Sequence, residues 1–504
     1  MLSPQKKLRG LAVSLLALLC TVNIPSPANA AHNRNQNSIQ ISQIPKEIPK
    51  SDSYQVKVRS QARDATGHWE PLDLFRANVH EVNATTGNTV SYNTSIGIFD
   101  FRGPIELAIE PSRGSFPSID AVRVRPLSYG LRADVRGRVI YLSLTEPANL
   151  VVELNGDVFN VLHLFLDSSG NDSFAEEQLM ENPSVIYYGA GYHELNDTVN
   201  VTSGQTVYLA PGSVIQGGFN FENTSDAAII GRGVLYRSPS DAITIGYSQR
   251  IRVAGVTVLN PGHYSLMIGS SRDIAVSGLR SISAVQWGDG IDVFCSQDVV
   301  LEKLFMRNSD DCVAIYQHRW EYYGDSRNIT LRDSSLWADV AHPVHLGLHG
   351  NPSAPEVMEG VTISNIDILD HREPQVDYQG CLAINCGDEN LLKDIVFEDI
   401  RVEDFRLGML LSFKVLYNQK YNLGPGRGVH NVTVRNLSYN GIGGNTPAIA
   451  GYEKDRSIQF VNFQGLDISG VHVWDGMQKP SWYSVADFVP MYIGSHVANL
   501  TWSD

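Results

Sequence analysis

Three aspartates lie in two short motifs whose spacing suits acid–base chemistry. Asp289 stands in a Gly-Asp-Gly turn, and Asp310 and Asp311 stand side by side 21 residues after it, each motif just before a strand-like run. If the backbone makes one solenoid turn in that interval, coils about 4.8 Å apart bring the three carboxyl groups onto one face. Crowded carboxylates repel, so one should keep a proton at neutral pH while the others stay charged. That combination is what cleavage of a glycosidic bond requires.

Each motif alone also has a plain structural interpretation. Asp289 would then be a turn residue, and the Asp310-Asp311 pair would cap a strand or bind calcium. The two motifs together, one coil apart, favour catalysis instead. Diagonal neighbours across coils reach the separation of about 6.5–9.5 Å that a water-activating, inverting pair of carboxyl groups uses.

A repeat in the second part of the chain supports the required coils. From about residue 185, short runs rich in β-branched residues recur, at intervals of 22 to 37 residues, with starts at positions 229, 251, 274, 299, 329, 361, 395, 432 and 458. Their alternation places Ile and Val inside and polar residues outside, as in a β-solenoid with several short strands per coil. Leucine-rich and helical repeats are excluded because their patterns are missing. Insertions near 317–328 and 370–390 are expected on one face, where loops build a cleft.

The parts of the chain before the repeat predict three further segments. Residues 1–30 have the charged start, short apolar core and Ala-Asn-Ala ending of an export signal, so we expect a secreted protein, extracellular or periplasmic. Residues 31–52 are polar and aperiodic and predict a mobile linker. Residues 53–168 alternate in short runs between Gly and Pro turns, which predicts a β-sandwich domain with a packing or carbohydrate-contacting role. Residues 185–504 would form the catalytic solenoid.

Charge and cysteine content exclude several classes of partner. The net charge of −15 argues against nucleic acid as a partner. No stretch after the signal is apolar enough to enter a membrane. We expect a monomer that binds a polysaccharide. Beyond the signal the chain carries Cys295, Cys312, Cys381 and Cys386. Disulfides and buried free thiols are both compatible with an exported chain. The cysteine spacing does not suit zinc.

The two aspartate motifs resemble the signature of a known family. The runs Asp289-Gly-Ile-Asp292 and Ser309-Asp-Asp-Cys-Val-Ala-Ile-Tyr316 resemble those of glycoside hydrolase family 28, the polygalacturonases and their relatives. The resemblance extends over about residues 185–470. It implies an all-β chain with a right-handed parallel β-helix, while the preceding small β-sandwich resembles the layout of the dextranase-like family 49, whose members act on neutral glucans.

The resemblance also implies roles for the aspartates. Asp310 would be the general acid that protonates the leaving oxygen, and Asp289 and Asp311 would hold and deprotonate the attacking water of an inverting O-glycosyl hydrolase. No metal or organic cofactor is needed for this reaction. Trp287 and Gly288 replace the Asn-Thr pair that usually precedes Asp289 in the family. This departure changes contacts with the sugar and leaves the acid untouched.

Further motifs of the family have partial matches. In the run Ala341 to Gly350, His342 takes the position of the family's active-site histidine and would orient the acid, with His345 and His349 as competing candidates. Lys414 matches the lysine of the family's Arg-Ile-Lys motif and would contact substrate, but Ser412 stands where the arginine is expected. Serine cannot make the bidentate carboxylate contact of arginine, which leaves a neutral glucan as an alternative to galacturonan.

Two other classes of function remain compatible with the sequence. A polysaccharide lyase on the same fold would need a basic proton abstractor and calcium-binding carboxylates, and Arg319 is the nearest basic residue. A non-catalytic, glycan-binding solenoid would make the aspartate cluster incidental. The sequence leaves the sugar, the linkage and the choice between endo and exo action open.

Overall fold

The computed structural model describes residues 38–504, apart from 63–66, 84, 169–175, 196 and 488. The expected export signal and the first part of the expected linker lie outside the described residues. The described chain is almost entirely β-structure, and its one α-helix is α1 (Glu176–Glu181). Within the described residues, no helix combines the length and apolarity needed to span a membrane.

The N-terminal domain consists of two facing sheets. One has six strands: β1 (Ser38–Gln40), β4 (Phe75–Val82), β5 (Thr89–Arg102), β7 (Val122–Arg125), β10 (Asn149–Leu154) and β11 (Asp157–Ser168). The other has five: β2 (Tyr54–Ser60), β3 (Glu70–Leu72), β6 (Ile105–Pro111), β8 (Asp134–Arg136) and β9 (Val139–Leu144). The alternating residues Tyr54, Val56 and Val58 are buried and face apolar residues of the opposite sheet, which makes the domain a β-sandwich.

The prediction of a mobile linker is wrong for its described part, residues 38–52. Strand β1 pairs antiparallel with β5, joining Ser38 to Arg102, and Ile44 and Ile48 are buried. The segment is polar overall, but a few of its apolar residues pack against the sandwich and hold the segment on it.

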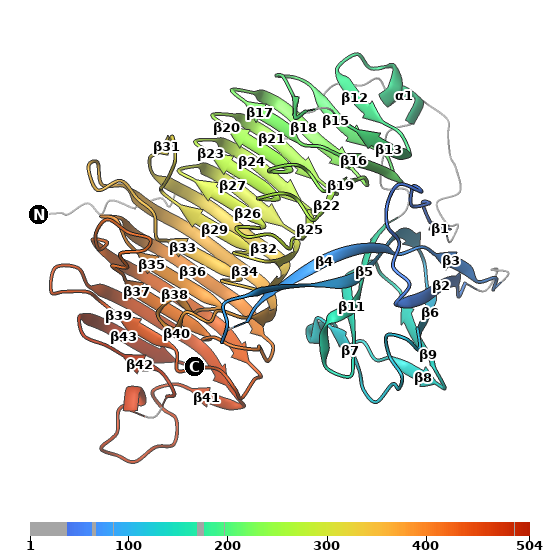
Figure 1. Ribbon diagram of the computed structural model, residues 1–504. Coiled ribbons are helices and arrows are strands. Elements are labelled where there is room, and N and C mark those ends of the chain that lie inside the picture. The colour runs from blue at the N-terminus through green and yellow to red at the C-terminus, as the bar shows by residue number, and fades with distance from the viewer. Residues whose placement is uncertain (1–37, 63–66, 84, 169–175, 196, 488) are drawn as a thin grey trace, which may run out of the picture. The chain divides into compact units, whose positions relative to one another are not determined.

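The second part of the chain is a right-handed parallel β-helix, as predicted, and its strands stack from β12 to β43 in Figure 1. Its larger sheet contains β12 (Val185–Tyr188), β13 (Gly191–Glu194), β15 (Thr206–Leu209), β16 (Ser213–Gln216), β18 (Ser225–Gly231), β19 (Val234–Tyr236), β21 (Gln249–Ala254), β22 (Thr257–Leu259), β24 (Arg272–Ser277), β25 (Arg280–Ile282), β27 (Gln297–Glu302), β28 (Phe305–Asn308), β32 (Ser326–Ala338), β34 (Val357–His371), β36 (Leu391–Val402), β38 (Gly428–Tyr439), β40 (Ile458–Ile468), β41 (Val471–Val473) and β43 (Val497–Ser503). From β32 onward, one long strand replaces the two shorter strands of each earlier coil, because β32 pairs with both β27 and β28.

The smaller sheet supplies one strand per coil and positions the aspartate motifs. It contains β14 (Val199–Asn200), β17 (Phe219–Glu222), β20 (Ile243–Gly246), β23 (Leu266–Gly269), β26 (Ile291–Phe294), β29 (Val313–Tyr316), β33 (Val344–Gly347), β35 (Leu382–Cys386), β37 (Leu411–Val415), β39 (Ala448–Ala450) and β42 (Tyr492–Ile493). A short hairpin, β30 (His318–Arg319) with β31 (Tyr322–Tyr323), and the 3-10 turns Leu127–Tyr129, Val376–Tyr378 and Val485–Asp487 complete the regular structure.

The pairing register confirms the repeat over most of its length. Ile251 pairs with Ile274, which pairs with Val299, and the same column continues through the predicted starts as far as Val432. At the two ends the prediction is out of register: Ile251 pairs with Ala227 rather than Ile229, and Val432 with Val461 rather than Ile458. In these coils several Ile and Val residues lie close together, so the sequence pattern does not show which of them is at the pairing position.

Both faces of the smaller sheet are covered near the aspartates. All four residues of β26 and of β29 are buried. Ile291 and Val293 belong to the apolar interior of the β-helix, whereas Phe294 belongs to a separate apolar cluster on the outer face with Tyr264, Tyr316 and Tyr378. Side chains on this outer face therefore sit under loops, where burial can change their pKa.

The cysteines resolve the alternative left open by the sequence. Cys295, Cys312, Cys381 and Cys386 are all buried free thiols. Burial raises the pKa of Cys295 to about 11 and that of Cys386 to about 12, so these thiols stay protonated.

A buried arginine links the sandwich to the β-helix. Arg125 is 1% exposed, and its guanidinium donates to Glu153 of the sandwich at 3.0 Å, to Glu403 of the β-helix at 2.8 Å and to the carbonyl oxygen of Leu369. Its ring partner is Trp337, with the guanidinium carbon 4.6 Å from the ring centroid.

We expect Arg125→Ala to lower the free energy of unfolding by about 3–5 kcal/mol, because two buried carboxylates lose their cation. The measurement is equilibrium unfolding in denaturant with the wild type in parallel. Arg136→Ala is the control, since its ion pair with Asp134 is exposed and its removal should change stability by less than about 1 kcal/mol. Equal effects of the two substitutions would contradict the role given to Arg125.

Candidate active site

Asp289, Asp311 and His342 occupy one column of the β-helix. Ile291 pairs with Val313, and Val313 with Val344, so the residues two places before each strand are aligned on three successive coils. The sequence prediction aligned Asp289 with Asp310, which is wrong by one residue. The interval between coils is 22 residues here, and Asp310 lies beside the column.

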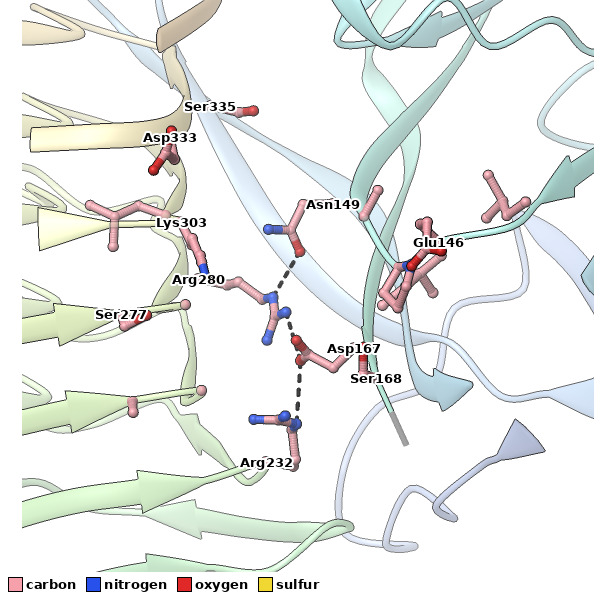
Figure 2. Close-up of a pocket in the computed structure, with 18 of the residues that line it drawn as sticks. Glu146, Asn149, Asp167, Ser168, Arg232, Ser277, Arg280, Lys303, Asp333 and Ser335 are labelled. Atoms are coloured by element: carbon pink, nitrogen blue, oxygen red, sulfur yellow. Dashed lines mark hydrogen bonds and ion pairs between the residues drawn. The ribbon is translucent and has the colours of Figure 1, made fainter. Parts of the chain in front are cut away.

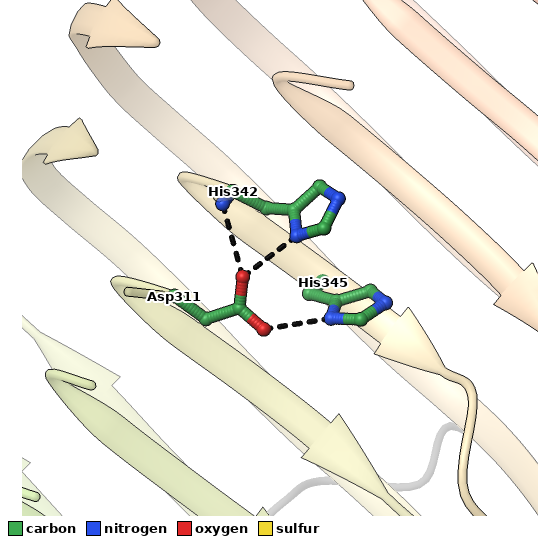
Figure 3. A group of neighbouring side chains, drawn as sticks. All are labelled: Asp311, His342 and His345. Carbon is green, nitrogen blue, oxygen red and sulfur yellow. Dashed lines mark hydrogen bonds and ion pairs between the residues drawn. The ribbon is translucent and has the colours of Figure 1, made fainter. Parts of the chain in front are cut away.

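Four hydrogen bonds surround the carboxylate of Asp311, which is 2% exposed. Oδ1 accepts from the backbone N–H of His342 at 2.9 Å and from its Nδ1 at 2.7 Å, and Oδ2 accepts from Nδ1 of His345 at 2.7 Å (Figure 3). Oδ2 also accepts from the hydroxyl of Tyr316 at 3.1 Å. Burial alone would raise the pKa of Asp311. The charges and hydrogen bonds of His345 and His342 outweigh burial and hold the pKa well below its usual range. Asp311 is therefore ionised.

The two histidines carry different numbers of protons. His342 is fully buried, and its nitrogens face two acceptors, the carboxylate of Asp311 and the carbonyl oxygen of Tyr378, so both nitrogens carry hydrogen. Burial alone would lower the pKa of His342, but Asp311 outweighs it and raises the pKa. His345 instead accepts from the amide of Asn385 at 3.1 Å while donating to Asp311, and burial lowers its pKa. His342 is thus an imidazolium and His345 is neutral.

The histidine predicted to orient the acid binds a different aspartate. His342 contacts Asp311, not Asp310, because the parallel register places it directly above Asp311. His345, a competing candidate in the sequence, holds the other oxygen of the same carboxylate. The third candidate, His349, lies 3.4 Å from a guanidinium nitrogen of Arg319, and burial lowers its pKa to about 3.

Asp310 has the opposite protonation state to its neighbour. Its side chain is partly exposed, and one of its oxygens accepts from the backbone N–H of Asp311 at 3.1 Å. Burial by the surrounding groups, followed by the charges of Asp311 and Glu373, raises the pKa of Asp310 to about 8. A carboxyl group that is protonated at neutral pH and open to the cleft has the properties that a general acid needs.

Beside Asp289 lies a second carboxyl group, Asp292, to which the sequence alone assigns no role. Asp292 is fully buried on the outer face of β26, and burial raises the pKa of both Asp289 and Asp292; the charge of Asp292 adds to the rise for Asp289, and the charge of Asp311 adds to it for Asp292. Neither oxygen of Asp292 meets a hydrogen-bond donor among the described residues, whereas Asp289 borders the cleft. An ionised carboxylate without donors is more costly than a neutral one, so the proton shared by the pair belongs on Asp292. The Asp-Gly-Ile-Asp motif contained this signal, since alternation in a strand puts Asp292 on the face of the site.

Two groups of side chains have metal-ligating types. Asp311, His342 and His345 form one, and Asp289, Asp310 and Asp311 form the other, with one oxygen of each within 4.8 Å of the others. The nitrogens of both histidines are engaged in hydrogen bonds, so none offers a free lone pair to a metal. In the second group, the proton on Asp310 and the proton on neighbouring Asp292 reduce the repulsion between the carboxyl groups. The oxygens of Asp289, Asp310 and Asp311 that approach most closely lie within 4.8 Å of one another. This is shorter than the separation of about 6.5–9.5 Å expected between the carboxyl groups of an inverting enzyme.

A cleft of about 710 Å³ opens above the aspartates. Its walls include the exposed rings of Trp287 and Trp320. Both insertions expected to line a cleft contribute to it, with Arg319 from the first and Glu373 from the second. Val82, at the end of β4, completes the wall. The N-terminal domain therefore contributes to the wall of the cleft. Next to Val82, Glu81 forms an ion pair of 3.3 Å with Arg372 of the β-helix, which holds this wall in place.

Lys414, the predicted substrate contact, lies two strands beyond His342, on β37. Its Nζ donates to the carbonyl oxygen of Asp377 at 3.1 Å, and it is not among the residues that line the cleft. The cations that line the cleft are Arg319 and Lys420. A direct contact of Lys414 with substrate therefore stays a prediction. Ser412, where the arginine was expected, is fully buried.

The fold and the site are those of a β-helix protein with an acid–base carboxylate centre. The model of the glycosyl hydrolases family 28 matches residues 197–448, half of the chain, and the chain belongs to this family. A polygalacturonase from Chamaecyparis obtusa is 28% identical over 171 residues, 33% of this chain and 30% of that protein. A dextranase from Arthrobacter sp. is 21% identical over 311 residues, 51% of this chain and 46% of that protein. The matched segments thus span between about a third and a half of these relatives.

A solved structure shows the same fold over nearly the whole chain. Dex49A from Penicillium minioluteum superposes with a TM-score of 0.60 and 13% identity, covering 92% of this chain and 96% of that one. Because the coverage includes the N-terminal domain, the likeness extends to the order of sandwich and β-helix.

The protonation states predict how activity depends on pH. Asp310 must be protonated, so kcat/KM should fall as the pH rises through about 8. Asp289 must be ionised, and because its pKa is raised, activity should also fall on the acid side at a pH above the usual carboxyl range. Initial rates across the pH range, with protein stability checked at each pH, measure both limbs. An alkaline limit set only by unfolding would contradict the assignment of Asp310.

The proton on Asp292 can be tested with an isosteric substitution. Asp292→Asn keeps a donor to Asp289, so we expect kcat within about tenfold of the wild type. Because its proton already makes Asp292 neutral, the amide leaves the charge beside Asp289 unchanged, so the acid limb should stay close to that of the wild type. Asp292→Leu removes the donor and should lower kcat by about 100-fold or more. If the Asn and Leu variants lose the same activity, the proton does not belong on Asp292.

Proposed function

We propose that this chain hydrolyses O-glycosidic bonds of a polysaccharide with inversion at the anomeric carbon. The observation that carries the proposal is the contrast between adjacent carboxyl groups: four hydrogen bonds hold Asp311 and keep its pKa low, whereas Asp310 borders the cleft with a pKa raised to about 8. Asp310 protonates the leaving oxygen, and the negative charge of Asp311 stabilises the positive charge that develops on the sugar.

Water, rather than a carboxylate, attacks the sugar in this proposal. Both oxygens of Asp311 are bound to buried donors, so direct attack on the anomeric carbon would break those bonds. Asp311 is also a weak base because its pKa is depressed. Asp289, with a raised pKa and a place at the cleft, binds the water and accepts its proton. Attack by water in one displacement inverts the configuration.

Galacturonan is the first candidate substrate. The relatives from Chamaecyparis obtusa and Juniperus ashei are polygalacturonases, which supports a pectic polymer of this type. Arg319 and Lys420 are the cations available in the cleft for a uronate carboxylate.

A neutral glucan is the second candidate. The cleft lining contains more acids than cations, namely Asp289, Asp310, Asp311, Glu373 and Asp388. Such a lining repels a polyanion, and exposed Trp287 and Trp320 offer flat apolar surfaces for sugar rings. The Arthrobacter relative is a dextranase, which supports the same candidate.

The proposal includes export and action as a monomer on a polymer outside the cell. The charged start and short apolar core of residues 1–30 support export. A lyase is the competing reaction, and it would produce an unsaturated sugar that absorbs ultraviolet light.

Asp310→Asn tests the proposed reaction. We expect a fall in kcat of about 100- to 10,000-fold, because the amide cannot donate the proton of a carboxylic acid at this site. The amide has the shape of the neutral acid, so the melting temperature should stay close to that of the wild type.

A substrate with an activated aryl leaving group provides the control, since it needs little protonation. Asp310→Asn should lose much less activity on this substrate than on the polymer. Unchanged turnover of the polymer by a folded variant would refute the role of Asp310.

One set of digests identifies both the substrate and the anomeric configuration of the products. Polygalacturonan, rhamnogalacturonan, dextran and pullulan are incubated separately with the wild type, and early products are followed by proton NMR and sized. Inverted anomers support the single displacement, whereas retained anomers overturn it. Ultraviolet absorption by the products would show a lyase, and binding without any product would show a non-catalytic solenoid.

A further inference from the structure

A second cavity, of about 990 Å³, lies between the sandwich and the β-helix. One wall consists of residues 143–149 and 166–168 of the sandwich, and the other of the turns that join strands of the larger sheet, from 230 to 335 (Figure 2). It shares no lining residue with the catalytic cleft. Its volume lies at the upper end of the range of about 300–1,000 Å³ found for ligand sites.

The β-helix wall of this groove runs across the turns of five successive coils. Gly231, Gly255 and Gly278 occupy the turn on three successive coils, and Lys303 and Asp333 occupy it on the next two. A Cβ at Gly278 would meet nothing nearer than 3.7 Å, so the missing side chain leaves open space. Five coils at about 4.8 Å per step extend over about 19 Å, which suits an extended chain better than a single small molecule.

The polar groups of the groove are held in place by the opposite domain. Arg280 is 3% exposed and donates to Asn149 at 2.8 Å, and it forms an ion pair of 2.7 Å with Asp167 of the sandwich. Arg232 lies 3.4 Å from the same carboxylate (Figure 2). These side chains are already ordered, so a ligand would not have to immobilise them.

The composition of the lining points to a neutral sugar polymer. Four cations, Arg232, Arg252, Arg280 and Lys303, stand against three acids, Glu146, Asp167 and Asp333, so the groove is close to neutral and does not favour a polyanion. Hydroxyl groups of Ser143, Thr145, Ser168 and Ser277 add donors and acceptors suited to sugar hydroxyls. Tyr129 at the edge is 44% exposed, and its hydroxyl bonds to Ser335, which fixes an aromatic ring facing solvent.

We propose that this groove is a second carbohydrate-binding site, which holds a neutral polysaccharide chain away from the catalytic cleft. The proposal does not depend on the reaction proposed above, because it concerns binding by a different set of residues. It gives the sandwich a part in carbohydrate contact as well as in packing.

The test is native affinity electrophoresis of the full chain carrying Asp310→Asn, in gels that contain dextran, pullulan or polygalacturonan, and in gels without polymer. We expect dextran or pullulan to retard this parent. Adding Tyr129→Ala or Lys303→Ala should weaken the apparent affinity for the neutral polymer about five- to tenfold, because a stacking surface or a donor is lost.

Two substitutions on the β-helix outside both cavities serve as matched controls. Tyr452 is 46% exposed and Lys454 is exposed, so Tyr452→Ala and Lys454→Ala should leave retardation unchanged. If only the catalytic cleft binds the polymer, the Tyr129 and Lys303 variants will migrate like the parent, and the proposal is overturned. Retardation by polygalacturonan alone, or by no polymer, overturns it as well.

Discussion

Asp311 carries a negative charge inside the protein, and four hydrogen bonds keep it there. His342, His345 and Tyr316 supply three side-chain donors, and the backbone of His342 supplies the fourth. Without them, burial would protonate Asp311 and remove the charge that keeps the proton on Asp310. The acid therefore owes its protonation to burial first, and then to the charge of a neighbour that does not contact the leaving group in the proposed reaction.

Parallel stacking is what allows this arrangement. In the β-helix, equivalent positions of successive coils lie about 4.8 Å apart, so one column brings Asp289, Asp311 and His342 together although 53 residues separate the first from the last. Ala314, between Asp292 and His345 in the next outward column, is small enough to let both groups reach the site. The same stacking places Gly231, Gly255 and Gly278 in a row along one wall of the groove on another face.

The N-terminal domain is more than an attached module. It donates Val82 to the catalytic cleft and one wall to the second groove, and Arg125 ties it to the β-helix through buried ion pairs. The buried charges require both domains to be in contact, because either partner alone would leave an unpaired charge in the interior.

The sequence by itself determined the β-helix, the repeat from Ile251 to Val432, and the three aspartates, because β-branched alternation and paired acidic motifs are local signals. It also contained Asp292, which strand alternation places on the face of the site, and His345, whose role nothing local distinguished from that of His342. Only the tertiary structure decided that Asp289 aligns with Asp311, that His342 binds Asp311 rather than Asp310, and that Lys414 lies off the cleft wall. These outcomes depend on pairing register, and a shift of one residue moves a side chain to another column or face. The free thiols, the strand β1 and the contribution of Val82 likewise depend on which distant segments meet, and a linear pattern does not record those contacts.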